Sequence, residues 1–436
     1  MKKVTECRAC GSKALTPVIS FSGADYVLCD PTRHARACGL LQSAQSTHDR
    51  PFEASSRHPS NRDHLRAMAT EALELLSGRD CAALDIGASD GALLSYYPRW
   101  VERFGVDPSE HIDEIGAWAW SAKAAFPSGE LDHAFGDKTF DIITAASVLE
   151  HVAAPRAFLA GVKARLAPDG IFALETVYAP SVLSKNAVDC FEAGLTAAYS
   201  LSVLEWIIRA EGMKVVKGSL TAKEGGSIRL FITHQDNNDL DFDPWSERLA
   251  RLWDEENALA LRAHQPYQSF EQRAAGVAAS FAGLLNKFRE RGQTVHILGA
   301  DENTAALLRL AGASARAVSA IVDSHAARES DRHAQSGLAI ISETESRAAE
   351  PDFLIAPARF KREMLERWRD TILLGGSMIF ATPQPHVVDA SNYAVEYGKT
   401  IAGNDDPGGA ETLRSILAAA GGLRLVADNK KIQKSA

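Results

Sequence analysis

The stretch of sequence that decides the fold is Leu84-Asp85-Ile86-Gly87-Ala88-Ser89-Asp90-Gly91, and Gly105-Val106-Asp107-Pro108-Ser109 completes it. The first is an apolar run that ends in a glycine-rich turn, and the second is a short apolar run that ends in an acid. Glycines let a backbone approach a ligand closely, and a carboxylate at the tip of the next strand can accept hydrogen bonds from a ribose diol. A glycine-rich turn can also join a strand to a helix without any ligand, but the acid that follows favours a cofactor site.

Length and composition indicate a protein of two or three domains, because 436 residues exceed the usual size of one. The hydrophobic fraction of 46% and the charged fraction of 24% are ordinary for a globular protein. The net charge of -9 argues against a nucleic-acid partner held by phosphate contacts. No apolar run reaches the roughly eighteen residues that span a bilayer, and no apolar segment follows the first lysines. We therefore expect a cytoplasmic protein without a membrane partner.

Four of the six cysteines lie near the N-terminus, at Cys7, Cys10, Cys29 and Cys38. In a long cytosolic chain, a Cys-x-x-Cys pair followed by two more cysteines is typical of a zinc site. Zinc prefers four tetrahedral thiolate or imidazole ligands, so we expect a structural site that either Cys29 or His34 completes. Four cysteines without a metal are the alternative.

Strand-like and helix-like segments alternate along the rest of the chain. Apolar runs predict buried parallel strands at residues 82–86, 104–106, 140–145 and 171–176, and Pro155 suits the first turn of a helix. The runs 215–216 and 228–233 predict an antiparallel hairpin at the end of this sheet. A second α/β unit is predicted to open at 294–300, with further strands at 318–322, 353–356 and 378–381.

The glycine-rich turn, together with Asp107, resembles the cofactor site of class I S-adenosylmethionine (SAM) methyltransferases. It lacks the third glycine of a dinucleotide-binding turn. The resemblance implies that Asp107 accepts the ribose hydroxyls, that a side chain at Gly87 would block the methionine moiety, and that Ser147 meets the amino acid end of SAM. The full implied set of SAM-binding residues is Asp85, Gly87, Ala88, Ser89, Gly91, Asp107, Pro108 and Ser147.

Residues 5–388 resemble the sugar C-methyltransferases that act on nucleotide-linked keto-deoxysugars. Besides the SAM motifs, the resemblance rests on Cys38-Gly39-Leu40-Leu41-Gln42, Ser55-Ser56 and His64, Phe140-Asp141-Ile142-Ile143 through Val152, Leu166-Ala167-Pro168-Asp169-Gly170, and Glu224-Gly225-Gly226-Ser227-Ile228-Arg229. It implies that the middle domain binds SAM and that the C-terminal domain helps to hold the nucleotide-sugar. It also implies that a proton beside a sugar ketone is removed first, which needs a general base and donors to the enolate oxygen.

We therefore expect an α/β protein with a class I SAM-methyltransferase Rossmann-like domain, an N-terminal zinc-binding lobe and a second, C-terminal Rossmann-like domain. The expected boundaries are 1–60 for the Cys-rich lobe and linker, 61–236 for the SAM-binding domain, 237–290 for a helical connector, 291–388 for the C-terminal Rossmann-like domain and 389–436 for a C-terminal tail.

The substrate side of the chain departs from the family pattern. Where the family has a Tyr-His-Glu-His run, this chain has Glu192-Ala193-Gly194-Leu195, and Glu224 replaces the family's His before Gly-Gly-Ser. Phe52 replaces a tyrosine ahead of Ser55-Ser56, and Asn303-Thr304 replaces a Lys-Gly pair in the C-terminal domain. The sequence thus predicts an intact SAM site and an altered acceptor site.

Five residues are candidates for the catalytic groups: His151, Glu192, Glu224, Tyr178 and Tyr199. The ordinary pKa of a histidine, about 6.5, suits proton transfer at His151, while a histidine that only caps or packs is the alternative. Glu192 or Glu224 could act as a base if an apolar pocket raised its pKa, but a solvated glutamate fits the pattern equally. Tyr178 and Tyr199 could donate to an oxyanion or simply pack in a half-buried position.

Two further residues are candidates for substrate binding. Arg229 could clamp a phosphate or carboxylate, with an ion pair as the alternative, and Asn303 follows the glycine turn of the second α/β unit. The sequence predicts a SAM-dependent methyltransferase whose partner is a small-molecule substrate, a nucleotide-linked sugar or a related metabolite. Because the family's base run is missing, transfer to oxygen or nitrogen of a non-sugar secondary metabolite stays open, as does a non-catalytic SAM-binding subunit.

Overall fold

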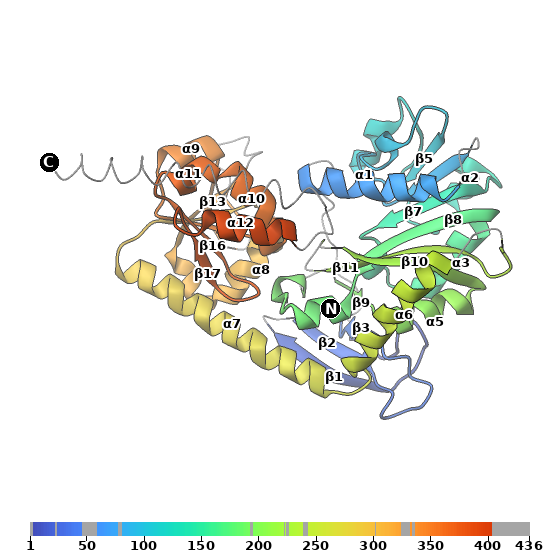
Figure 1. The fold of residues 1–436 in the computed structure, drawn as a ribbon, viewed down its shortest axis with the longest axis horizontal. Helices are drawn as coiled ribbons and strands as arrows, with labels where there is room; N and C mark the ends of the chain where they lie inside the picture. Colours follow the sequence, from blue (N-terminus) through green and yellow to red (C-terminus); the bar gives the residue numbers. More distant parts are fainter. Residues whose placement is uncertain are drawn as a thin grey trace. The chain divides into compact units, whose positions relative to one another are not determined.

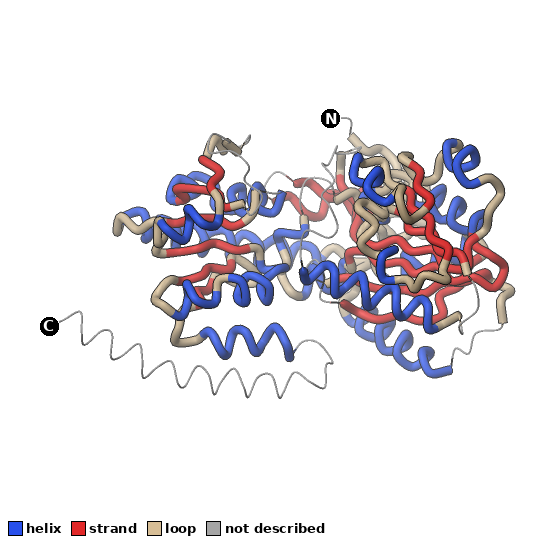
Figure 2. Tube along the Cα trace, turned by 90° about the horizontal axis from the view of Figure 1, so that it is seen from above, coloured by secondary structure: helices blue, strands red, loops and turns tan. Residues whose placement is uncertain are grey.

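The computed structural model divides the chain into two compact units, Met1–Lys185 with Ala193–Glu271, and Asn186–Glu192 with Gln272–Ala436. In each unit, helices cover a central sheet (Figures 1 and 2). The structure describes residues 3–21, 24–45, 59–76, 81–191, 195–221, 223, 226–238, 243–300, 302–323, 332–333 and 336–402.

The first unit is built around a seven-stranded sheet of order β6-β5-β4-β7-β8-β11-β10. Five strands are parallel, namely β4 (Ala82–Ile86), β5 (Glu102–Val106), β6 (Trp120–Ala122), β7 (Phe140–Ala146) and β8 (Leu166–Val177). The hairpin of β10 (Met213–Thr221) and β11 (Ser227–His234) adds an antiparallel edge, with β11 beside β8. The strand order reverses between β4 and β7. In open α/β sheets, ligands bind at such a switch point, outside the carboxyl ends of the strands.

Helices cover both faces of this sheet because its central strands are apolar on both sides. On one face, α1 (Pro59–Glu74) contributes Leu65 and Met68 to a hydrophobic cluster with alternate residues of β4, β7, β8 and β11. On the other face, α3 (Pro155–Arg165) and α5 (Leu201–Ala210) form a second cluster with the intervening residues of the same strands. The shorter helices α2 (Glu130–Phe135) and α4 (Ala179–Ser184) lie in connections, and α6 (Asp243–Ala258) packs against β10 (Figure 1).

The N-terminal lobe is a small antiparallel sheet of order β1-β2-β3-β9. Its strands are β1 (Leu15–Phe21), β2 (Ala24–Cys29), β3 (Leu41–Ser43) and β9 (Ala197–Ala198). The last of these belongs to the connection between α4 and α5. The lobe is therefore joined to the seven-stranded part by a strand pair and lies within the same unit.

The second unit has a six-stranded sheet of order β14-β13-β12-β15-β16-β17, parallel except for its last strand. The strands are β12 (Val295–Leu298), β13 (Val318–Val322), β14 (Ala339–Ile341), β15 (Phe353–Ala356), β16 (Ser377–Phe380) and β17 (His386–Val388). The helices are α8 (Glu302–Ala311), α9 (Glu343–Ala348), α10 (Lys361–Arg367), α11 (Arg369–Leu373) and α12 (Tyr393–Ala402). The segment 186–192 also packs here, since the Thr382 hydroxyl donates to Asp189 at 3.3 Å.

The architecture confirms the predicted fold class, and every apolar run predicted as a strand falls within a strand or extends it by one residue at most. Pro155 occupies the first turn of α3 as predicted. The predicted connector at 237–290 is divided, because α6 lies in the first unit and α7 (Gln265–Glu290) begins there and ends in the second. Among the described helices, none has both the length and the apolar character that crossing a membrane requires.

Candidate functional site

The glycine-rich turn after β4 is tied to the end of the neighbouring strand β5. The backbone N–H groups of Gly87 and Ala88 both donate to the carbonyl of Val106, at 2.8 and 3.2 Å. Gly87 has a φ of +78° and Gly91 a φ of +75°, conformations that favour glycine. A Cβ at Gly87 would lie 2.5 Å from the Cγ2 of Val148, so this protein's own side chain excludes a larger residue there.

Asp107 is held at the mouth of this turn by two backbone groups. Its carboxylate accepts from the N–H of Ser89 at 3.0 Å and from the N–H of Ser109 at 2.7 Å, one bond to each oxygen. The side chain is buried, and Pro108 separates it from Ser109. Each carboxylate oxygen retains a further lone pair with which it can accept another hydrogen bond.

Asp85 lies one strand away, on the face of the sheet that α1 covers. Its carboxyl is buried and accepts from the Thr144 hydroxyl at 2.6 Å. Burial raises the pKa of Asp85 to about 7, Asp107 adds to the rise, and Thr144 opposes it. A cationic group placed beside this carboxyl would favour its charged form. Ser147, which directly follows the neighbouring strand β7, has a φ of +57° and donates its backbone N–H to the carbonyl of Glu175.

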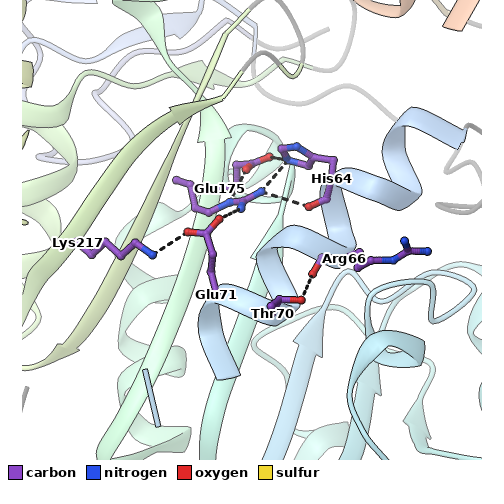
Figure 3. A network of polar contacts seen from close by, with 7 residues as sticks. His64, Arg66, Thr70, Glu71, Glu175 and Lys217 are labelled. Carbon is purple, nitrogen blue, oxygen red and sulfur yellow. Dashed lines mark hydrogen bonds and ion pairs between the residues drawn. The ribbon is translucent and has the colours of Figure 1, made fainter. Parts of the chain in front are cut away.

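A polar network that the sequence did not suggest lies on the same face, where α1 crosses β8 and β11 (Figure 3). Glu175 of β8 is fully buried and accepts from Arg229 Nε at 2.9 Å, while its other oxygen is hydrogen-bonded to Nε2 of His64. Arg229 also donates to Glu71 at 2.7 Å, and Lys217 donates to Glu71 at 2.8 Å. Burial raises the pKa of Glu175, but His64 and Arg229 outweigh it and lower the pKa to about 2.

The four N-terminal cysteines converge, and all of their Sγ atoms lie within 4.8 Å of one another. The Sγ distances are 3.5 Å for Cys7 to Cys38 and 3.4 Å for Cys10 to Cys29, and none of the four forms a disulfide. This donor set suits a tetrahedral thiolate site. Of the two alternatives for the fourth ligand, the geometry fits Cys29, because His34 is exposed and its Nδ1 accepts from the backbone N–H of Arg36.

Comparison with protein families indicates the class of activity. Residues 60–217 match a family model described as a methyltransferase domain. Residues 222–383 match a model described as the C-methyltransferase C-terminal domain. This chain is a SAM-dependent methyltransferase.

Known proteins resemble the methyltransferase to different extents. The C-methyltransferase NovU of Streptomyces niveus is 23% identical over 425 residues, which are 90% of this chain and 99% of NovU. A tRNA U34 carboxymethyltransferase of Idiomarina loihiensis is 28% identical over 160 residues, 33% of this chain and 47% of its own length. A solved structure of Burkholderia thailandensis 1,6-didemethyltoxoflavin-N1-methyltransferase with S-adenosylhomocysteine (SAH) is 18% identical, with a TM-score of 0.32, and covers 45% of this chain and 96% of that one.

Among the predicted catalytic residues of the methyltransferase, Tyr178 and Tyr199 are neighbours, joined by a parallel backbone bridge. His151 is half-buried at the end of the short turn η3 (Leu149–His151), and its carbonyl accepts from the Thr196 hydroxyl. The hydroxyl of Tyr178 donates to Glu256 at 3.1 Å and that of Tyr199 to the Leu149 carbonyl at 3.4 Å, and both rings are buried. Both tyrosines thus have internal acceptors. Glu192 and Glu224 lie outside the described residues.

The predicted substrate-binding residues also have specific placements. Arg229 is 2% exposed, and its guanidinium forms ion pairs with Glu71 and Glu175. This is the arrangement that the sequence analysis gave as the alternative to a phosphate clamp. The backbone of Asn303 lies in α8, but its side chain lies outside what the structure describes. The residues that sequence reasoning missed are Glu175 and the role of His64. An acid inside the apolar run of β8, and the helical spacing of His64 and Glu71, were the available signals.

Proposed function

We propose that this methyltransferase transfers a methyl group to carbon in a nucleotide-linked keto-sugar or a related small metabolite. The observation that carries the proposal is the likeness to a C-methyltransferase over 90% of this chain and 99% of the relative, across the SAM unit and the second α/β unit alike. The motifs that resemble sugar C-methyltransferases supply the acceptor class.

The residues of the first unit fit SAM. Asp107 would hold the ribose diol, and the backbone of the turn at Gly87, Ala88 and Ser89 would lie against the methionine moiety. The buried carboxyl of Asp85 offers a partner for the ammonium group. When bound, SAM supplies an electrophilic methyl group on sulfur.

Methyl transfer to carbon demands more of the protein than transfer to a lone pair, because a C–H bond must first lose its proton. The chain therefore needs a base near the carboxyl ends of β7 and β8. Of the three bases predicted from sequence, His151, Glu192 and Glu224, only His151 lies among the described residues. The four thiolates are proposed to hold a structural zinc ion, which would leave no open position for chemistry.

The test is a methyl-transfer assay with SAM and a panel of acceptors, followed by mass spectrometry of SAH and of the methylated product. Thymidine- and uridine-diphosphate-linked keto-deoxysugars should be methylated at carbon. Nucleoside diphosphates alone should raise the melting temperature, since they share the recognised group. Turnover only with non-sugar oxygen or nitrogen acceptors would refute the acceptor assignment, and SAH binding without turnover on any acceptor would favour a binding subunit.

A further inference from the structure

His64 and Glu175 form a buried imidazole–carboxylate pair that the proposed SAM contacts do not use. His64 projects from α1 and Glu175 from β8, and the two side chains meet under the helix (Figure 3). The Glu175 side chain has no exposed surface, whereas the His64 side chain keeps 17% of its surface exposed. The pair therefore has one closed side, at Nε2, and one side toward the surface.

The partners of Glu175 decide which nitrogen of His64 carries the proton. Arg229 lies 2.9 Å from Glu175, and its positive charge favours the ionised form of that carboxylate. An ionised carboxylate only accepts hydrogen bonds, so Nε2 of His64 must donate, and Nδ1 then carries a lone pair. The structure shows no partner for Nδ1 among the residues it describes. The Arg229 NH2 group lies 3.2 Å from Nε2 and 3.3 Å from the His64 carbonyl, and with Nε2 donating to Glu175 the carbonyl is the acceptor that remains for it.

The charges around His64 do not require its protonation, because Lys223 adds a further positive charge to those of the network. Glu71 and Glu175 are paired with Lys217 and Arg229, two acids with two bases, in one connected set of hydrogen bonds. Burial lowers the pKa of His64, and Lys223 and Arg229 lower it further, while Glu175 raises it. The imidazole is therefore neutral near pH 7, the form that can accept a proton.

The pair lies beside the cofactor crevice. The Glu175 carbonyl accepts from the N–H of Ser147, which follows the last residue of β7, and Glu175 itself precedes the carboxyl end of β8 by two residues. Because side chains alternate along strands, Asp85, Thr144 and Glu175 share the face that α1 covers. Because β7 lies between β4 and β8, a small molecule at the switch point between β4 and β7 would lie one strand away from Glu175.

We propose that His64 is the proton acceptor of the reaction, acting through Nδ1, and that Glu175 and Arg229 are positioning residues that fix its tautomer. This rests on the proposed function, because only an acceptor with a C–H beside a ketone needs such a base. The C–H bond breaks, its electron pair becomes the enolate, and the proton passes to Nδ1. The enolate carbon then takes the methyl group, the C–S electron pair stays on sulfur, and His64 returns its proton to water.

The experiment measures hydrogen exchange without methyl transfer. The full chain is mixed with SAH and a thymidine-diphosphate-linked keto-deoxyhexose in deuterated water, and proton NMR follows the signals beside the ketone. His64→Gln places an amide nitrogen where Nε2 stands, so the bond to Glu175 survives while the Nδ1 lone pair is lost. We expect exchange to slow by roughly 10²–10⁴-fold, with SAH affinity and melting temperature retained.

Matched variants distinguish a proton-accepting role of His64 from a structural role and from a role of His151. His133→Gln makes the same change at an exposed histidine of α2 and should exchange like the wild type. If His64→Gln exchanges as fast as the wild type, or if His151→Gln alone abolishes exchange, the assignment of His64 is wrong. Glu175→Gln should slow exchange less than His64→Gln and shift its pH profile, which a merely structural role would not do.

A second measurement keeps the inference testable if the variant misfolds or the acceptor class is wrong. Nitrogen NMR of isotope-labelled histidine in the SAH-bound wild type should show His64 neutral at pH 7 and protonated on Nε2. A charged ring, or a proton on Nδ1, would overturn the inference. If the wild type binds SAH tightly but does not exchange hydrogen on the probe, the proposed acceptor class is wrong. The tautomer of His64 measured by NMR then decides whether His64 can be the proton acceptor.

Discussion

At the scale of single residues, Gly87 combines two constraints that can be separated experimentally. Its φ of +78° strains any other residue, and a Cβ there would lie 2.5 Å from Val148. Gly87→Ala should therefore lower the free energy of unfolding by about 2–5 kcal/mol, measured by urea denaturation. Gly11→Ala, at a φ of +71° with no atom within 4 Å, should cost only about 1 kcal/mol. Val148→Ala in the Gly87→Ala background should recover the difference, and a failure to do so would contradict the steric account.

Asp107 supports a prediction about the cofactor. In Asp107→Asn, the amide nitrogen must face the N–H of either Ser89 or Ser109, because the native carboxylate accepts from both. We expect the affinity for SAH, measured by calorimetry, to fall at least about tenfold, equivalent to about 1.4 kcal/mol. Asp113→Asn, at an exposed acid paired with Lys123, is the control and should bind SAH normally. Unchanged binding by Asp107→Asn would remove Asp107 from the SAM site.

The sequence could indicate Asp107 because the pattern that marks it is local and consists of the turn and strand that precede it. The network around Glu175 is different in kind. His64 and Glu175 are 111 positions apart, and Arg229 is 54 positions beyond Glu175. Only the sheet order, which puts β11 beside β8, brings them together. The same order turns Arg229 from a predicted phosphate clamp into a buried ion-pair partner.

At the scale of elements, Glu256 of α6 joins three parts of the first unit. Its carboxylate accepts from the N–H groups of Leu201 and Ser202, at the start of α5, and from the Tyr178 hydroxyl. An acid at a helix start satisfies free N–H groups and favours the helix dipole. Glu256→Ala should lower the free energy of unfolding by about 2–3 kcal/mol, since it leaves buried donors unpaired. Glu255→Ala, at an exposed neighbour, should change it by less than about 0.5 kcal/mol, and equal effects would contradict the capping role.

The elements that sequence analysis found and missed differ in length and burial. β4 and β12 are buried throughout, so their apolar runs stand out from the polar segments around them. β6 and β14 have three residues each, and neither is an apolar run buried along its length. β9 has two residues and exists because β3 is available to pair with it. Such strands form because of tertiary pairing, which no local sequence pattern predicts.

At the scale of the whole molecule, the cysteine lobe is built into the methyltransferase unit. The β3–β9 pair joins them, the Tyr26 hydroxyl donates to the Leu195 carbonyl at 3.1 Å, and the Ser43 N–H donates to Thr196. Loss of a metal from the four thiolates should therefore destabilise the structure beyond the lobe. The connection from α4 to α5, which contributes these partners, should loosen with it.

This predicts that the purified protein contains one zinc ion per chain, measured by elemental analysis, and that a strong chelator lowers the melting temperature of the methyltransferase unit. Structural zinc sites contribute directly to folding free energy, so a drop of at least several degrees is expected. A Cys7→Ser, Cys10→Ser double variant should lose the zinc and show the same drop. Cys190→Ser, outside the cluster, should keep both its zinc and its melting temperature. A metal-free wild type of undiminished stability would show instead that the four thiols are held together by packing alone.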